Sequence, residues 1–532
     1  MKPTFQCARR PVLAVWLFFA VAVAGLPAAA AFAQEPPRGY AEIRVIDSET
    51  GRGVPLVELE TVNNLRFVTD NAGRVAFNEP GLLGTEVFFF VRSHGYEFLK
   101  DGFGMQGVRL TPRAGETAEI KIQRVNIAER MCRLTGQGLY RDTRLLGMDP
   151  PENVPCNGLV SGQDSVQAAV YKDKVFWIWG DTSRLKYPLG LFRAAGATTP
   201  IPDPNDESSD PAGGIPFNYF VDETGFARAM IPIADRPEGV VWIFGMCTVK
   251  DATGAEKLIA HYSRRASLAE ELEQGICVFN DKLQIFEPVK QLPPDETWRR
   301  PRGNPVIFEE DGHQWLLIGS PAMNVRVPAT LEAVLDPQQY EALTCAATNP
   351  QRGLPEVQQA PNGRANWRWQ KELPPMDSRT ELQLVRAGKL DGKDTRFCPK
   401  DVDNESKRVI LHSGTVRWNE YRQRWVMLAG QVEGESSYLG EVWYAEADHP
   451  SGPFAQAVKV VTHDQYSFYN VRHQEFLDRD GGRSIHFEGT YSHTFSGNSV
   501  QTPRYDYNQV LYRLDLDDEQ LNGARLNAVG DN

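Results

Sequence analysis

Val175-Phe-Trp-Ile-Trp-Gly180 is an aromatic run that ends on glycine, and the chain repeats its shape. Four later segments share it: Val240-Val-Trp-Ile-Phe-Gly245, Gln314-Trp-Leu-Leu-Ile-Gly319, Arg424-Trp-Val-Met-Leu-Ala-Gly430 and Ser484-Ile-His-Phe-Glu-Gly489. Each follows a turn, and another strand-like run precedes each turn. Repeated strand–hairpin–strand units with room for further strands are typical of a β-propeller. The pattern predicts an all-β chain with a five-bladed β-propeller over residues 160–520, with insertions between Met323 and Lys407. A large β-sandwich or barrel is the alternative.

The segment before the repeats has a different pattern. From Tyr40 apolar residues alternate with polar ones, and turn residues separate the runs, which predicts a small antiparallel β-sandwich over residues 38–125. Its motifs resemble the carboxypeptidase regulatory-like (transthyretin-like) domain family: Val45-x-Asp47-x-x-Thr50-Gly51, Thr69-Asp70-x-x-Gly73-Arg74-x-x-Phe77 and His94-Gly95-Tyr96. The resemblance implies an accessory module for spacing, docking or weak glycan contact. Residues 126–159 are expected to be a linker.

The first 33 residues have the features of a signal peptide. A basic start (Lys2, Arg9 and Arg10) precedes the apolar run from Val12 to Leu26, and Ala31-Phe32-Ala33 fits the small-x-small cleavage pattern. The apolar run is short for a membrane span, so an uncleaved anchor is the weaker alternative. We expect an exported protein, periplasmic or extracellular, with no stable membrane span after cleavage.

The charge of the chain argues against nucleic acid as a partner. The 532 residues carry a formal charge of −12, and loss of the three leader cations takes it to −15. Phosphate contacts need clustered lysine and arginine, and no long basic run exists.

The cysteines suggest disulfide bonds. Six of them remain after the leader, an even number that permits three bonds in an exported chain. Sequence neighbours suggest the pairs 132–156, 247–277 and 345–398, although fifteen connectivities are allowed. No CxxC or histidine-rich spacing indicates a zinc site.

Polar residues recur where the innermost strand of each blade should begin, near one mouth of the central channel. They lie about sixteen residues before each closing glycine: Asp164, Arg228, Asn304, Ser413–Gly414 and His473. Side chains from different blades converge there, so these positions are candidates for a site.

The first blade, from Gly162-Gln163-Asp164-Ser165 through Tyr171 to Trp177, resembles the five-bladed glycoside hydrolases, the clan of arabinanases, xylosidases and fructan hydrolases. The resemblance implies that Asp164 is the base or nucleophile and that His473 lies near the channel centre. It implies no required cofactor, allows a structural calcium or sodium ion in the channel, and leaves any metal ligands unknown.

The chain departs from that family in blades two and three, where Arg228 and Asn304 replace carboxylates. A glycosidase needs two carboxyl groups at the scissile bond, so the second must come from elsewhere. Glu488 is the first candidate, followed by Glu435 with its neighbour Glu433, and then Asp181.

Arginines near the expected mouth suggest an acidic substrate such as a uronate or sulfated glycan, because guanidinium groups bind such anions through paired hydrogen bonds. They could equally neutralise acidic neighbours. The candidate substrate-binding residues are Arg228, Asn304, Arg302, Arg472, His473 and Asp181, with Arg299 and Arg300 nearby. The stretch 497–508 could form a loop over the mouth in which Tyr505 and Tyr507 stack on sugars.

The sequence therefore predicts an exported carbohydrate-active enzyme, a glycoside hydrolase that uses carboxylate acid/base chemistry. Two alternatives remain: a non-catalytic glycan- or protein-binding propeller, or a polysaccharide lyase acting on uronates with His473 or a tyrosine as base.

Overall fold

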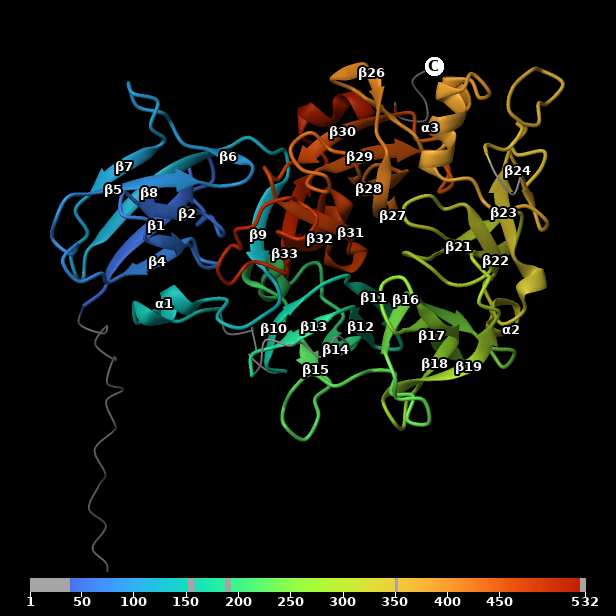
Figure 1. The fold of residues 1–532 in the computed structure, drawn as a ribbon, viewed down its shortest axis with the longest axis horizontal. Helices are drawn as coiled ribbons and strands as arrows, with labels where there is room; N and C mark the ends of the chain where they lie inside the picture. The colour runs from blue at the N-terminus through green and yellow to red at the C-terminus, as the bar shows by residue number, and fades with distance from the viewer. Residues whose placement is uncertain (1–38, 152–157, 187–192, 350–352, 527–532) are drawn as a thin grey trace, which may run out of the picture. The chain divides into compact units, whose positions relative to one another are not determined.

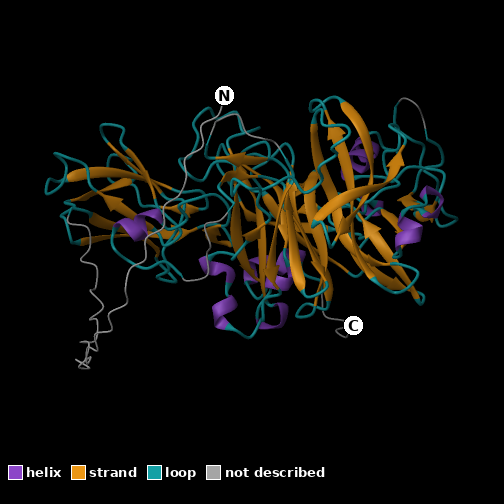
Figure 2. Ribbon diagram, turned by 90° about the horizontal axis from the view of Figure 1, so that it is seen from below, coloured by secondary structure: helices purple, strands orange, loops and turns teal. Residues whose placement is uncertain are grey.

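A computed structural model describes residues 39–151, 158–186, 193–349 and 353–526 (Figure 1). The expected leader and Cys156 lie outside the described residues. Strands are the main regular structure of the described chain, and the few helices are short pieces in the connections (Figure 2).

The N-terminal part is a sandwich of two four-stranded sheets. Their orders are β4-β1-β8-β6 and β3-β2-β5-β7. The pairing is antiparallel except between β1 and β8, which run parallel. The strands are β1 (Ala41–Asp47), β2 (Glu58–Thr61), β3 (Arg66–Val68), β4 (Arg74–Phe77), β5 (Val87–Arg92), β6 (Tyr96–Glu97), β7 (Gly107–Leu110) and β8 (Thr117–Arg124).

Five further sheets are the blades of the propeller. In chain order their orders are β11-β12-β14-β15, β16-β17-β18-β19, β20-β21-β22-β23-β24, β27-β28-β29-β30 and β31-β32-β33-β9, with β25 and β26 added to the outer edge of blade four. The short pair β10–β13 leads into and out of blade one.

The bounds of these strands are β9 (Glu129–Arg133), β10 (Val160–Gln163), β11 (Gln167–Tyr171), β12 (Lys174–Trp179), β13 (Thr182–Arg184), β14 (Ala195–Pro200), β15 (Asn218–Tyr219), β16 (Val240–Lys250), β17 (Glu256–Arg265), β18 (Glu271–Asn280), β19 (Ile285–Leu292), β20 (Val306–Glu310), β21 (His313–Ile318), β22 (Val325–Pro328), β23 (Glu341–Thr344), β24 (Arg368–Gln370), β25 (Lys400–Asp401), β26 (Asn404–Arg408), β27 (Leu411–Asn419), β28 (Arg424–Gln431), β29 (Val442–Ala447), β30 (Gln456–Val461), β31 (Ser467–His473), β32 (Ser484–Ser492) and β33 (Asn508–Asp515).

The helices are α1 (Arg141–Leu145), α2 (Leu331–Val334) and α3 (Ser378–Arg386), and single 3₁₀ turns are η1 (Glu207–Ser209), η2 (Pro211–Gly213), η3 (Pro337–Gln339), η4 (Gly392–Asp394), η5 (Glu475–Leu477), η6 (Asp480–Gly482) and η7 (Glu519–Ala524). The predicted insertion between Met323 and Lys407 contains α2, α3 and the strands that widen blades three and four. Within the described ranges, no helix is both long enough and apolar enough to cross a membrane.

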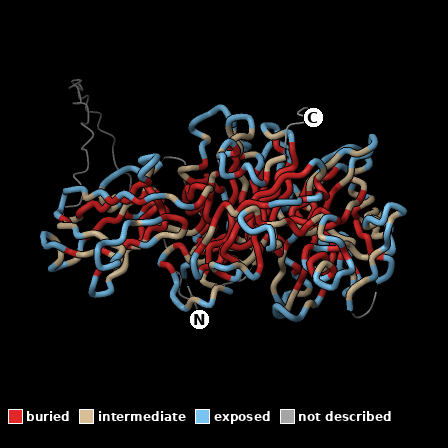
Figure 3. The backbone as a smooth tube through the Cα atoms, turned by 90° about the horizontal axis from the view of Figure 1, so that it is seen from above, coloured by how far each residue is buried: buried red, intermediate tan, exposed pale blue. Residues whose placement is uncertain are grey.

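Every pair of neighbouring blades shares an apolar core, and this makes the propeller a closed ring. Blades one and two meet around Phe176 and Tyr262, and blades two and three around Ile259 and Leu316. The remaining three interfaces, between blades three and four, four and five, and five and one, are built in the same way. The buried segments follow these strands, while exposed segments are mostly loops (Figure 3). The predicted five-bladed architecture is therefore confirmed.

The ring closes through a strand in the stretch expected to be a linker. β9 pairs antiparallel with β33, with Arg133 opposite Val510 and Cys132 opposite Leu511. It thereby supplies the outermost strand of blade five from a segment before blade one. Two of its arginines are buried because backbone carbonyls accept their hydrogen bonds: Arg130 donates to Pro55 and His94, and Arg133 to Thr135.

Blade two differs from the sequence-based expectation. Val240–Gly245 was expected to be a second strand, but it begins β16, the strand of blade two that packs against β11. No inner strand precedes it, so Arg228 does not lie at the channel mouth. The long β16, which contains a register shift between Phe244 and Cys247, stands in place of both the inner strand and the second strand expected for blade two.

Two predicted disulfides are wrong. Cys247 and Cys277 are buried free thiols, and so are Cys345, Cys398 and Cys132. Cys247 lies opposite Ile259 and Cys277 opposite Ala260, and these consecutive residues of β17 face opposite sides of the sheet. The two thiols therefore belong to different inter-blade cores.

We predict that Met131→Ala weakens ring closure. Met131 in β9 is fully buried in the core between blades five and one, and truncating such a side chain costs about 2–5 kcal/mol. Denaturant unfolding measures the loss. Val125→Ala, at a half-exposed position outside β9, is the control. Equal stability of the two variants would contradict the role of β9.

Candidate functional site at the channel mouth

Asp164 lies between β10 and β11, at the mouth of the channel. Its Oδ1 accepts a hydrogen bond from the backbone N–H of Asp181 at 2.8 Å, and its carbonyl accepts one from Gly180 N at 2.9 Å. A side chain at Gly180 could not fit, because a Cβ there would stand 2.7 Å from Asp164 Oδ1. The predicted closing glycine of blade one thus allows the two aspartates to approach each other.

Asp164 and Asp181 form a carboxyl pair that holds protons unusually well. Burial raises the pKa of Asp164 to about 6, and the nearby charge of Asp181 adds to the effect. Burial also raises the pKa of Asp181 above its ordinary value. The charge of Asp181 disfavours ionisation of Asp164, so the two carboxyl groups resist being ionised together.

Donors from other segments hold this pair in place. Tyr469 of blade five donates its phenol hydrogen to Asp164 Oδ2 at 3.2 Å, and Trp242 of blade two donates its indole N–H to Asp181 Oδ1 at 2.7 Å. The phenol of Tyr507 also acts on both carboxyl groups and lowers their pKa values. These donors favour the ionised form and oppose the effect of burial.

The expected stacking role of Tyr505 and Tyr507 is therefore wrong. Tyr505 is buried and donates to the carbonyl of Thr69 in the N-terminal sandwich at 2.9 Å. Tyr507 instead contributes a phenol to the carboxyl pair.

Backbone strain marks the same place. Ser165 and Asn470 are non-glycine residues with φ of 54°, in the left-handed region. Asn470 Nδ2 donates to Ser165 Oγ at 2.6 Å, and Asn470 Oδ1 accepts from Ser413 Oγ at 3.1 Å. Blades one, five and four are thus joined at the mouth by strained residues, and such strain clusters at functional sites.

Accessible aromatic rings flank the carboxyl pair. Phe244, 36% exposed, stands 6.5 Å from the half-buried Trp242. On the other side Phe495, 60% exposed, packs edge-on against Tyr469 at 5.9 Å. Such rings can cover the C–H face of a sugar while their neighbours make polar contacts.

Two arginines of the segment before β20, Arg300 and Arg302, lie beyond these aromatic rings, on the side of Phe244. Arg300 Nη1 lies 3.0 Å from Nε2 of His261, whose ring stands 6.0 Å from Phe244. Arg302 donates to Asn324 Oδ1 at 2.6 Å, while its buried Nε has no hydrogen-bond partner. In the described part of the chain neither guanidinium has a carboxylate within ion-pair distance. Burial lowers the pKa of Arg302 to about 10, so it remains a cation at neutral pH.

Three predicted substrate-binding residues instead build the channel interior. Arg472 is buried and donates to Asn304 Oδ1 and to the carbonyl of Ala168, which joins blade five to blades three and one. Asn304 in turn donates to the carbonyl of Gly414 in blade four at 2.8 Å. His473 is fully buried and bonded to Asp478 at 2.9 Å. Their surroundings are protein groups, so we correct their roles from substrate binding to structure.

Three of the four candidates for the second carboxylate, Glu488, Glu435 and Glu433, are not placed to act with Asp164. Glu488 is fully buried and accepts from Gln474 Nε2 at 2.8 Å, and burial raises its pKa to about 7. Its side chain therefore has no contact with the solvent at the mouth. Glu435 is exposed and pairs with Lys407 Nζ at 2.8 Å, which lowers its pKa, and Glu433 pairs with Arg379.

Of the sequence candidates, the structure brings together Asp164 and Asp181, with Arg302 further along the mouth. Arg228 lies in a pocket at the other end of β11. Sequence reasoning missed Trp242, Tyr469 and Asn470. Trp242 stands in a repeat segment, three residues before the closing glycine, and that position was its one signal. Among the described residues no cluster of three or more His, Cys, Asp or Glu side chains could hold a metal ion.

No family model matches the chain, and no curated protein matches it. Solved structures do. An exo-β-1,3-galactanase from Phanerochaete chrysosporium with galactose matches at 10% identity and a TM-score of 0.32, over 66% of this chain and 61% of that one. An exo-1,5-α-L-arabinanase from a bovine ruminal metagenomic library matches at 8% identity and a TM-score of 0.32, over 67% of this chain and 94% of that one. A GH43_1 enzyme from Xanthomonas citri complexed with xylose matches at 11% identity and a TM-score of 0.31, over 66% of this chain and 87% of that one.

The chain spans 61% to 66% of the length of the three galactanase structures from P. chrysosporium that it matches. TM-scores of 0.31 and 0.32 are too low to support an argument about function, which therefore has to come from the residues at the mouth.

We predict that Asp164 keeps its proton to about pH 6, whereas an ordinary aspartate loses it near 3.8. Infrared difference spectra should show a protonated carboxyl band that disappears near pH 6 and is missing from Asp164→Asn. Trp242→Phe removes a donor that favours ionised Asp181, so the pKa of Asp181 should rise. Glu488→Gln is the control, and its spectra should keep the carboxyl band that disappears near pH 6. If this band were still present in Asp164→Asn, its assignment to Asp164 would be contradicted.

Proposed function

We propose that this protein is a glycoside hydrolase whose catalytic carboxyl groups are Asp164 and Asp181. The observation that carries the proposal is the pairing of these two half-buried carboxyl groups at the mouth, where burial raises both pKa values. Glycosidic cleavage needs one carboxylic acid and one carboxylate with different proton affinities. No other pair of candidate carboxyl groups from the sequence meets this requirement at the mouth.

In the proposed reaction the protonated member donates its hydrogen to the leaving glycosidic oxygen as the C–O bond breaks. The ionised member stabilises the positive charge at the anomeric carbon and takes a proton from the water that adds there. The higher proton affinity favours Asp164 as the acid, the reverse of the role implied by the resemblance in sequence. No step requires a cofactor.

The surroundings of the pair support a sugar as substrate. Trp242, Phe244 and Phe495 offer ring faces and edges beside the carboxyl groups, and carbohydrate offers C–H faces between hydroxyl groups. The leader pattern supports action outside the cytoplasm.

The two unpaired arginines support an acidic group on that sugar. Arg300 and Arg302 follow the aromatic rings away from the carboxyl pair, and both lack an ion-pair partner among the described residues. A half-buried guanidinium without a counterion costs desolvation free energy, which a substrate carboxylate or sulfate would offset. We propose a uronate-containing or sulfated glycan.

A non-catalytic glycan-binding propeller is the second candidate. It is favoured by Asn304, which occupies the blade-three position as a buried structural residue where a carboxylate was expected from the resemblance. A lyase has less support, because His473 is buried against Asp478 and burial raises the pKa of Tyr469 far above neutrality.

We predict that Asp164→Asn and Asp181→Asn each lower reducing-end release from a polysaccharide panel at least about a hundredfold, the usual contribution of a positioned acid or base. The amide oxygen at position 164 can still accept the bond from Asp181 N, so the melting temperature should stay close to that of the parent. Asp295→Asn, at an exposed position, is the control.

The pH profile of the parent should fall on its alkaline side near pH 6, where Asp164 loses its proton. Full activity in both asparagine variants would remove the pair from the mechanism. If the parent released no reducing ends from any polysaccharide of the panel but still bound glycan, the non-catalytic glycan-binding propeller would be favoured.

We predict that Arg302→Gln lowers kcat/KM for an acidic glycan about tenfold relative to a neutral one, since a charge-assisted hydrogen bond is lost. Arg302→Lys should retain part of the preference. Arg299→Gln is the matched control, because Arg299 is already paired with Glu296 at 3.2 Å. Preference for neutral glycans in the parent would contradict acidic recognition.

A further inference from the structure

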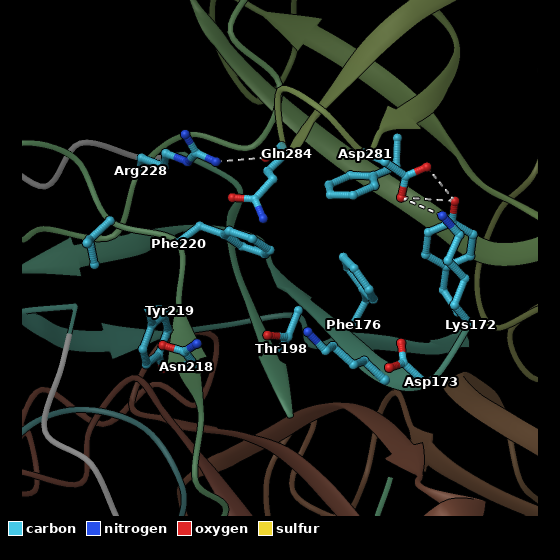
Figure 4. A pocket seen from close by; sticks show the side chains of 14 residues that line it. Lys172, Asp173, Phe176, Thr198, Asn218, Tyr219, Phe220, Arg228, Asp281 and Gln284 are labelled. Carbon is cyan, nitrogen blue, oxygen red and sulfur yellow. Dashed lines mark hydrogen bonds and ion pairs between the residues drawn. The ribbon is translucent and has the colours of Figure 1, made fainter. Parts of the chain in front are cut away.

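A pocket of about 470 Å³ opens between blades one and two, at the end of β11 opposite Asp164 (Figure 4). Its walls include the turn after β11, Lys172 to Lys174, and the turn before β19 at Gln284. Asp164 precedes β11 and Lys172 follows it, so the length of that strand separates the pocket from the carboxyl pair. The proposed reaction makes no use of this pocket.

Aromatic rings form the apolar part of the pocket. The rings of Phe176 and Phe220 are 6.3 Å apart and inclined by 30°, and Phe279 stands 5.0 Å from Phe176. Figure 4 shows Phe220 and Phe176 on facing sides of the space, with Thr198 between them. Polar side chains surround these rings, a combination that suits a sugar ring with one apolar face and polar edges.

Arg228 brings a positive charge to the rim of this pocket. Its Nη2 donates to the carbonyl of Gln284 at 2.9 Å, and its guanidinium lies 5.6 Å from the centre of the Phe220 ring (Figure 4). Its Nε is buried without a hydrogen-bond partner. Within the described ranges no carboxylate lies at ion-pair distance from Arg228.

The opposite side of the pocket shows the contrast. Lys172 Nζ pairs with Asp281 at 3.0 Å, and the phenol of Tyr171 donates to the same carboxylate at 3.1 Å. Two carboxylates line the pocket, Asp173 and Asp281. Asp281 is engaged in this way, and among the described residues neither lies at ion-pair distance from Arg228, which keeps its charge for another anion.

We propose that this pocket is a second saccharide-binding site, which takes a sugar acid with its C–H face on Phe220 and Phe176 and its carboxylate on Arg228. The class of ligand rests on the proposed function, since an acidic glycan cleaved at the mouth would offer further uronate residues. Binding itself is independent of Asp164 and Asp181. The site would hold a glycan chain on the far side of blade one from the reaction.

The test measures hydrogen–deuterium exchange of the backbone amides of the full chain with millimolar D-glucuronate. D-glucose, added separately, is the neutral analogue. Glucuronate should protect peptides covering 171–176 and 279–286, in the parent and in Asp164→Asn alike. Arg228→Gln should weaken the binding of glucuronate at this site about tenfold, and Phe220→Ala should weaken it as well. Lys282→Gln removes a positive charge from the same turn, but Lys282 does not line the pocket, so this control should bind like the parent.

Three outcomes would overturn the proposal: no protection of these peptides, equal protection by glucose, or equal loss in Arg228→Gln and Lys282→Gln. If the protection appears but no glycan is cleaved, the second site stands and the hydrolase proposal fails. If glycan is cleaved without the protection, the reverse holds. Unchanged melting temperatures of the variants exclude unfolding as the cause of lost binding.

Discussion

Pairing of β9 with β33 is the constraint on which the rest of the propeller depends. Thr135 and Asn508, bonded at 2.8 Å next to this pair of strands, are 373 residues apart in sequence. Joining such distant segments has an entropic cost, and the five inter-blade cores offset it together because the ring closes only when every blade packs against both of its neighbours. The same strand connects the N-terminal sandwich to blade five, since Arg130 donates to carbonyls of the sandwich.

Ring closure also explains why the channel residues are structural. Five inner strands converge, and their buried polar groups need hydrogen-bond partners. Arg472 and Asn304 do this by bonding across blades, and Arg417 of blade four donates to the carbonyl of Asn304 at 3.2 Å. Closing the ring therefore uses the residues that sequence reasoning assigned to substrate. Groups that can meet a ligand are left at the mouth, beyond this network.

Much of the fold could be predicted because each blade repeats a local pattern. Val175 to Trp179 is a continuous apolar run that ends on glycine, as a strand buried on both faces does, and β12 is that strand. Two parts could not be predicted in this way. Glu129-Arg-Met-Cys-Arg133 has three charged residues in five and does not resemble a buried strand. It is buried because Arg130 donates to the distant carbonyls of Pro55 and His94, and Arg133 to those of Thr135 and Gln137. In blade two, counting back from Gly245 assumed an inner strand that the long β16 replaces.

Only those residues of the site that come from a single blade could be predicted to lie together from the sequence. Asp164 and Asp181 flank one hairpin, so their proximity was within reach of the sequence, whereas Trp242 and Tyr469 come from other blades. The position of Glu488 in the repeat does not tell that β32 is buried on both faces, and this burial keeps Glu488 away from the mouth.

The carboxyl pair lowers the stability of the folded chain. Two acidic groups with raised pKa values repel each other at neutral pH, in a protein that is already acidic, and Ser165 and Asn470 beside them adopt a strained backbone conformation. A purely structural site could replace either aspartate with asparagine and keep the hydrogen bonds. Local features that reduce stability without a compensating structural role are typical of functional sites. The cost at Asp164 and Asp181 is the one that the proposed hydrolase chemistry would require, since that chemistry needs one proton and one negative charge in the same place.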